Sequence, residues 1–153
     1  MNRVAERPTA PTRPSAATAQ MLSAGIAVFA AYHLLLAAFM AIAPHTFFTS
    51  VGPFGTSNSH YIRDLATYNA AIGAVLALAL ARPSWRLPVL ALCTIQFALH
   101  TLNHLLDIGA SHPAWNGYFD FGSLAFSTLL LVWLMRAAAA DERRRPTDTR
   151  RPR

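Results

Sequence analysis

Four long stretches of almost entirely apolar sequence limit what this chain can fold into more than any other feature. They cover about residues 21 to 43, 62 to 81, 87 to 107 and 117 to 136. Each is close to the roughly 20 residues that a helix needs to cross the hydrocarbon core of a bilayer. We therefore expect an all-α protein, a four-transmembrane-helix antiparallel bundle whose main partner is the lipid bilayer.

The distribution of charge excludes a soluble helical bundle, because each helix of such a bundle carries a polar outer face. Hydrophobic residues make up 54% of the chain and charged residues only 13%. Most of the charge lies near the two ends. We expect a disordered cytoplasmic tail over residues 1–19, a membrane domain over 20–138, and a basic, disordered cytoplasmic tail over 139–153. Between Ser15 and Gly122 the charged residues are Arg63, Asp64, Arg82, Arg86, Asp107 and Asp120.

The arginines predict the orientation of the bundle. If both termini are cytoplasmic, all of the 13 basic residues except Arg63 lie in the tails, at the inner helix ends or in the inner loop. Positive charge is typical of cytoplasmic segments, so this arrangement is the favoured one. The same tails account for the net charge of +6. No folded basic module accompanies that charge, and we expect no nucleic-acid partner.

The third apolar stretch carries a polar stripe. Gln96, His100, Asn103, His104 and Asp107 recur at the spacings of one helical face. Polar side chains that face lipid are costly, so they turn toward the interior of a bundle, where they mark either contacts between helices or a working site. The stripe thus predicts a polar interior near the outer end of this helix.

The predicted orientation brings polar residues of the other helices to the same extracytoplasmic end. From this cluster we expect an accessory, structural or ligand-binding membrane protein. No nucleophile lies in an elbow or triad pattern, so whether the protein is an enzyme stays open. The phenylalanines of the outer loop, Phe47, Phe48 and Phe54, are expected at the headgroup layer or as a cap on the bundle. The predicted cluster consists of His60, Arg63, Asp64, His100, Asn103, His104, Asp107 and Asp120.

Two interpretations of this cluster need only its own side chains. In the first it is a clamp between helices, in which Arg63 pairs with Asp107 or Asp120. In the second it is a divalent-metal site, because His100 and His104 are four residues apart and can chelate one ion, with Asp107 extending the same face. A closed metal site would take further ligands from His60, Asp64 or Asp120. As partners besides lipid we expect a second copy of the chain or a larger membrane complex, since the alanines of the second stretch permit close packing.

A third interpretation makes the chain a membrane redox protein that binds haem, quinone or a metal through His33, His100 and His104. His33 in the first stretch and His100 in the third lie at similar depth when counted at about 1.5 Å per residue. Two histidines at matched depth on different helices are suited to ligate haem iron from both sides. They are equally suited to hydrogen-bond a quinone carbonyl.

In its layout the chain resembles the small bacterial four-helix membrane proteins grouped as DoxX-like. The first stretch ends Ala43-Pro44-His45, an outer loop with Val51-Gly52-Pro53-Phe54-Gly55 follows, and residues 60–64 and 100–107 carry the remaining motifs. The resemblance covers about residues 21 to 137. It implies a multi-pass protein of the bacterial inner (plasma) membrane and quinone-linked redox chemistry, and it assigns no functional residue.

Overall fold

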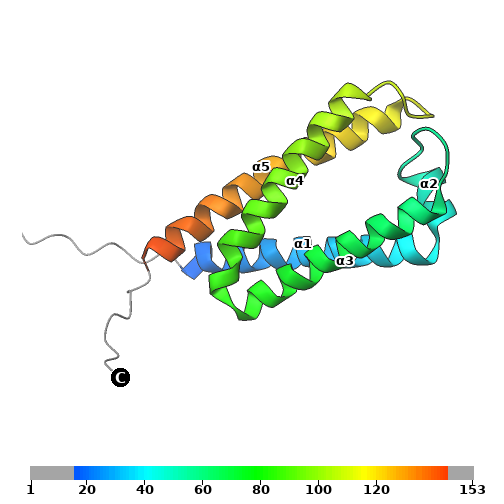
Figure 1. The fold of residues 1–153 in the computed structure, drawn as a ribbon. Helices are drawn as coiled ribbons and strands as arrows, with labels where there is room; N and C mark the ends of the chain where they lie inside the picture. Colours follow the sequence, from blue (N-terminus) through cyan, green and yellow to red (C-terminus); the bar gives the residue numbers. More distant parts are fainter. Residues whose placement is uncertain (1–15, 145–153) are drawn as a thin grey trace, which may run out of the picture.

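The computed structural model describes residues 16–144, and all regular structure in this range is helical. Four of the helices are long and apolar enough to cross a membrane, and they pack antiparallel, which confirms the predicted fold class. The chain is thus a small multi-pass membrane protein with four candidate spans (Figure 1). The elements are α1 (Ala16–Ile42), α2 (Pro44–Ser50), α3 (Ser59–Ala81), the 3-10 helix η1 (Pro83–Trp85), α4 (Arg86–Leu106) and α5 (Trp115–Arg143).

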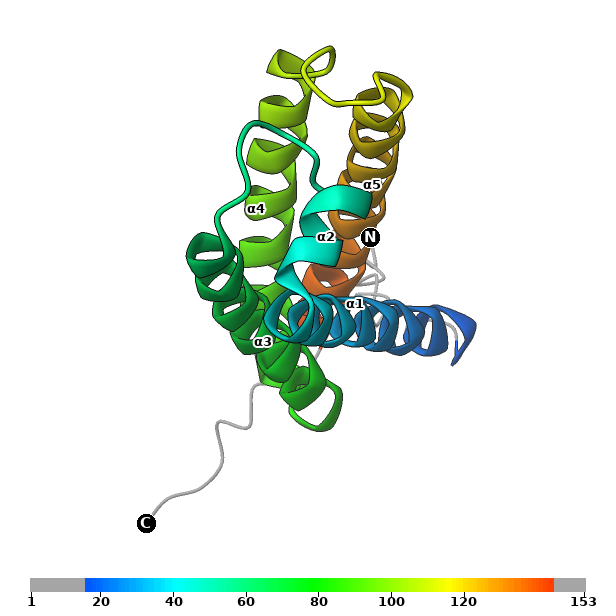
Figure 2. The ribbon, with the colours of Figure 1, turned by 90° about the vertical axis from the view of Figure 1, so that its right-hand side faces the viewer.

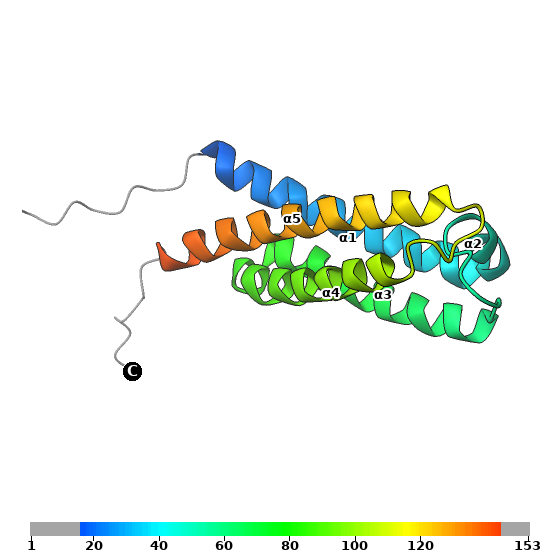
Figure 3. The same cartoon turned by 90° about the horizontal axis from the view of Figure 1, so that it is seen from above.

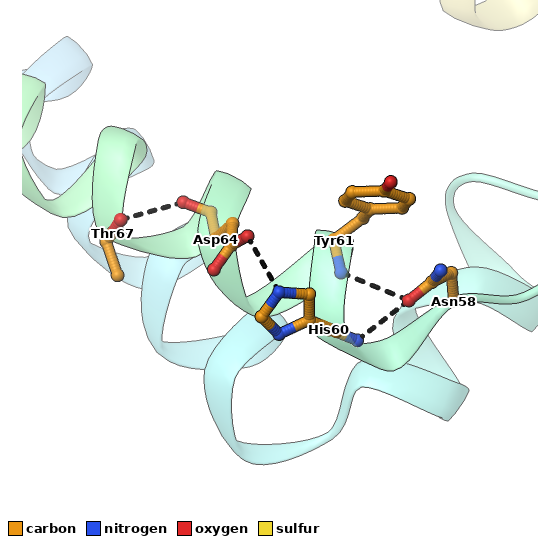
Figure 4. Close-up of polar contacts among 5 residues, drawn as sticks. All are labelled: Asn58, His60, Tyr61, Asp64 and Thr67. Carbon is orange, nitrogen blue, oxygen red and sulfur yellow. Dashed lines mark hydrogen bonds and ion pairs between the residues drawn. The ribbon is translucent and has the colours of Figure 1, made fainter.

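The helix ends follow from local chemistry. Pro44 has no N–H to continue α1, and it occupies the first position of α2, where a missing N–H costs nothing. The side chain of Asn58 caps α3, because its Oδ1 accepts hydrogen bonds from the backbone N–H groups of His60 at 3.1 Å and Tyr61 at 3.3 Å (Figure 4). At the other end of α3, the Arg86 guanidinium donates to the carbonyl of Ala79.

Two helices extend beyond the expected membrane domain. α1 begins at Ala16 and α5 continues to Arg143, because alanines and other good helix formers continue past the most apolar sequence. The outer loop expected over 45–61 contains the short helix α2. The rest of the two expected tails, residues 1–15 and 145–153, lies outside the described residues.

The four long helices form two pairs. α1 packs along α3, and α4 packs along α5. The pairs meet near η1 and diverge toward α2, so that the molecule resembles a V seen from the side (Figure 1). Seen from above, the α4/α5 pair lies over the α1/α3 pair (Figure 3). We call the two ends of the molecule the η1 end and the α2 end.

The apolar core fills the η1 end, where all four long helices contribute buried side chains. Ile26, Leu76, Leu90 and Leu131 are fully buried there, one from each long helix. On the outside, large apolar side chains such as Leu129 at 71% exposure face away from the bundle, as lipid-facing residues do. The core therefore joins the two pairs at one end and leaves the space between them at the α2 end for other side chains.

Candidate functional site

A cavity of about 300 Å³ lies between the two helix pairs, on the α2 side of the core. α2 and the segment after it lie across the opening of the V, in front of this space (Figure 2). All four long helices contribute to its wall. The lining residues are Tyr32, His33, Leu36 and Met40 of α1; Phe47, Val51, Gly52 and Phe54 of α2 and the following segment; Leu65, Tyr68, Asn69 and Ile72 of α3; Gln96, Phe97, His100 and His104 of α4; and Asp120, Ser123 and Leu124 of α5.

On the α1/α3 side the polar wall is a hydrogen-bonded pair. His33 is only 2% exposed, and its Nδ1 lies 2.9 Å from Oδ1 of Asn69. Nδ2 of Asn69 donates to the carbonyl of Leu65 at 2.9 Å, which fixes Oδ1 as the acceptor side of the amide. His33 therefore donates through Nδ1–H. In the neutral ring Nε2 is then an acceptor, and this atom is buried with no partner in the protein.

On the α4 side three polar residues follow one another at intervals of one helical turn. Nε2 of Gln96 lies 3.4 Å from Nδ1 of His100, and Nε2 of His100 lies 3.0 Å from Nε2 of His104. The amide nitrogen of Gln96 can only donate, so a neutral His100 donates onward from its Nε2–H to His104. His104 is then left with a donor, Nδ1–H, that has no partner, and Gln96 with an unpartnered acceptor, Oε1.

The buried side-chain atoms without a hydrogen-bond partner all belong to this cavity. Within residues 16–144 they are His33 Nε2, Gln96 Oε1, His104 Nδ1 and Asp120 Oδ2, and each of the four residues lines the cavity wall. Buried polar atoms of native proteins are nearly always paired, with protein, water or ligand. Their concentration around one cavity is therefore a property of the site and not a scatter of packing faults.

Aromatic side chains form much of the remaining wall. Phe97 lies at the base of the cavity, and its ring packs edge-on against His33 with the centroids 5.8 Å apart. Phe54, from the segment after α2, packs edge-on against His104 with a centroid distance of 5.2 Å. This contact connects the segment to α4 across the opening. Tyr32 and Tyr68 line the cavity from α1 and α3.

The structure brings some of the predicted site residues together and leaves others apart. His100, His104 and Asp120 line the cavity, and so does His33. Five other predicted residues are exposed and do not line it: His60, Arg63, Asp64, Asn103 and Asp107. Among these, His60 and Asp64 form an ion pair of 3.4 Å along the surface of α3 (Figure 4).

The clamp and the metal site find little support in this geometry. In the described part of the chain no ion pair joins Arg63 to Asp107 or Asp120. Side-chain hydrogen bonds between long helices stay within each pair at the α2 end, as in the 3.0 Å bond between the hydroxyls of Thr101 and Thr128. Nor do three His, Cys, Asp or Glu residues anywhere in residues 16–144 come together as a metal site would require.

The haem interpretation requires a free nitrogen on each of two histidines. His33 offers Nε2. Both ring nitrogens of His100, in contrast, take part in hydrogen bonds along α4. Ligation by His100 would break one of these bonds, so the two histidines are not equivalent in the way that paired axial ligands usually are.

Asn69 is a polar residue of the cavity wall that the sequence analysis did not single out. It is the one Asn or Gln within the apolar run from Leu65 to Ala81. A lone amide at that depth is costly unless it is paired, and this cost is a signal that the sequence alone contains. Tyr32, near the middle of the first apolar stretch, gave no such signal, because most of its side chain is an apolar ring.

Comparisons with protein-family models, with curated proteins and with solved structures found no match to this chain. The DoxX-like resemblance therefore receives no support from them. The function has to be argued from the cavity itself.

Proposed function

We propose that this membrane protein binds a lipid-soluble organic molecule with a polar head group in the cavity between its two helix pairs. The observation that carries this proposal is the gathering of four unpartnered buried polar atoms on the wall of one cavity. Among the functions that the sequence analysis considered, this proposal corresponds to a ligand-binding protein. The proposed site requires only one copy of the chain.

The energetics favour a ligand over a purely structural role. Leaving a buried polar group unpaired costs about 1–3 kcal/mol. A structural clamp would remove this cost by pairing these atoms with side chains of a neighbouring helix, and within residues 16–144 none of the four is so paired. A bound head group would pair the same atoms. The wall thus has the arrangement expected of a site whose hydrogen bonds are completed from outside the protein.

The size and lining of the cavity support a small organic ligand. Ligand sites usually enclose roughly 300–1,000 Å³, with mostly apolar walls and a few convergent polar groups. This cavity has about 300 Å³, and apolar residues such as Leu36, Ile72 and Leu124 separate its polar groups. A ring or branched head group fits this volume, while an attached chain would extend between the diverging helix pairs into lipid.

The cavity can be tested by filling it. Leu124→Trp places a large ring inside from α5, and Leu36→Trp does so from α1. Leu129→Trp is the matched control, because Leu129 is on α5 but is 71% exposed. Each variant is expressed in the source organism, purified in mild detergent and extracted with organic solvent, and the small molecules that co-purify are quantified by mass spectrometry.

We expect one molecule in near-stoichiometric amount with the wild type and the Leu129→Trp variant. Both cavity-filling variants should lose it by about tenfold or more, because the tryptophan ring would occupy space that the head group needs. Recovery of a quinone or haem in this fraction would assign the protein to redox chemistry. An equal small-molecule content in all four proteins would contradict the proposal and return the cavity to a structural or water-filled role.

A further inference from the structure

We infer that the ligand of this cavity is a lipophilic ammonium, a protonated amine attached to an apolar body. The inference rests on the proposed function and makes it specific. It follows from the hydrogen-bonding polarity, the charge and the aromatic lining of the same wall.

The unpartnered atoms are mainly acceptors. His33 Nε2, Gln96 Oε1 and the carboxylate Oδ2 of Asp120 accept hydrogen bonds, and only His104 Nδ1 donates. A ligand that completes this wall has to bring more donors than acceptors. A primary ammonium brings three N–H donors and no acceptor, whereas a ketone, an ester or a carboxylate brings acceptors alone.

The charge of the cavity wall also favours an ammonium over a neutral or anionic ligand. Among residues 16–144, Asp120 is the one acidic residue that lines the cavity, and no arginine of this range lines it. The chain contains no lysine that could reach it. The buried Oδ2 of Asp120 has no hydrogen-bond partner within residues 16–144. A carboxylate oxygen withdrawn from water is costly, and a cation in the cavity would offset that cost. An anionic ligand would add a second negative charge beside the first.

The aromatic lining suits a cation as well. Tyr32, Phe47, Phe54, Tyr68 and Phe97 line the cavity from five different elements or segments. Aromatic faces attract cations through the ring quadrupole, and the attraction is strongest in a site that excludes water. A neutral alcohol could donate its one O–H to one of the acceptors, but it would gain no attraction of charge from Asp120 or from these rings. Acceptors, charge and rings together select an ammonium.

Two probes with the same body and different heads test the inference. The amine is 4-hexylbenzylamine, and its neutral counterpart is 4-hexylbenzyl alcohol. Binding of each is measured by titration calorimetry to the full chain in nanodiscs of phosphatidylcholine, with protein-free nanodiscs as the blank. The variant Asp120→Asn removes the charge without changing the shape of the side chain. The matched control is Asp107→Asn, because Asp107 is an exposed carboxylate at the same end of the molecule and does not line the cavity.

We expect the amine to bind the wild type at least about tenfold more tightly than the alcohol, a difference of about 1.4 kcal/mol, because only the amine brings a positive charge to Asp120 and the aromatic rings. Asp120→Asn should bring this ratio close to one while the alcohol still binds, and Asp107→Asn should leave the ratio unchanged. Equal affinity of the two probes for the wild type would overturn the inference that the ligand is an ammonium, and it would leave the proposed ligand-binding function intact. Binding of neither probe would count against the proposed function itself.

Discussion

The buried side chain of His33 shows how neighbouring residues determine the orientation and the hydrogen bonding of a single group in this protein. An imidazole at 2% exposure in a membrane-length helix is unfavourable unless its nitrogens are paired. Asn69 pairs Nδ1 from the neighbouring helix and is itself anchored to the carbonyl of Leu65. The ring is thereby fixed in one orientation, with Nε2 on the cavity wall. Asn69 thus orients the histidine, and the histidine contributes the acceptor.

Substituting Asn69 tests this pairing. Asn69→Leu leaves the Nδ1–H of His33 buried without an acceptor, and it should lower the free energy of unfolding in detergent by about 1 kcal/mol. Asn103→Leu is the control, because Asn103 is exposed on α4 and should tolerate the same change. Adding His33→Phe to Asn69→Leu should recover part of the loss, since no polar group is then left unpaired. A loss equal to that of Asn103→Leu would show that the bond contributes nothing.

The polar stripe of α4 was only partly predictable at this scale. Gln96, His100 and His104 share a face because they are four residues apart, and helical spacing alone places them together. Asn103 is about 100° around the helix from His104, and that angle is enough to expose it. Asp107 lies just past the last residue of α4, where its backbone N–H caps the helix. Spacing does not reveal where a helix ends.

At the scale of the elements, the spans were predictable and their pairing was not. A span is recognised from length and apolarity, and all four spans of the structure overlap the predicted ones. In a membrane, however, the side of a helix that faces lipid is as apolar as the side that faces the core. The sequence pattern therefore does not indicate that α1 pairs with α3, or that the two pairs diverge. The short helix α2 was missed because Pro44 both ends one helix and begins the next.

Close packing of α1 on α3 depends on Gly73. A Cβ at this position would lie 2.8 Å from Cγ and 3.0 Å from the backbone nitrogen of Leu34. Gly73→Ala should therefore destabilise the protein by about 1 kcal/mol or more, because backbone atoms cannot move aside. Gly122→Ala is the matched control: nothing lies within 4 Å of its Cβ position on α5, so the gain in helix propensity should dominate. The temperature of thermal unfolding, measured for both variants, tests this prediction. If Gly73→Ala is as stable as Gly122→Ala, the α1–α3 contact is looser than the structure shows.

The molecule as a whole is divided into two unlike ends. The η1 end holds the apolar core, and the α2 end holds the cavity with its polar wall. The basic residues follow the same division. Among the described residues, η1 is flanked by Arg82 and Arg86. The C-terminal end of α5, which lies toward the η1 end of the molecule, carries or directly precedes Arg136, Arg143 and Arg144. The α2 end, in contrast, has Arg63. From the positive-inside tendency we expect the cavity at the extracytoplasmic side.

This orientation predicts which end of the protein a membrane-impermeant reagent can reach. In a Cys93→Ala background, Ser57→Cys marks the segment after α2, and Ser84→Cys marks η1; both serines are exposed. We expect a charged maleimide to label the first variant in intact spheroplasts and the second only after permeabilisation. Both sites should react fully in detergent, which controls for intrinsic reactivity. The reverse pattern would place the cavity on the cytoplasmic side, and its ligand would then have to come from the cell interior or the inner leaflet. The expected pattern directs the search for the ligand to molecules of the outer leaflet and the space beyond it.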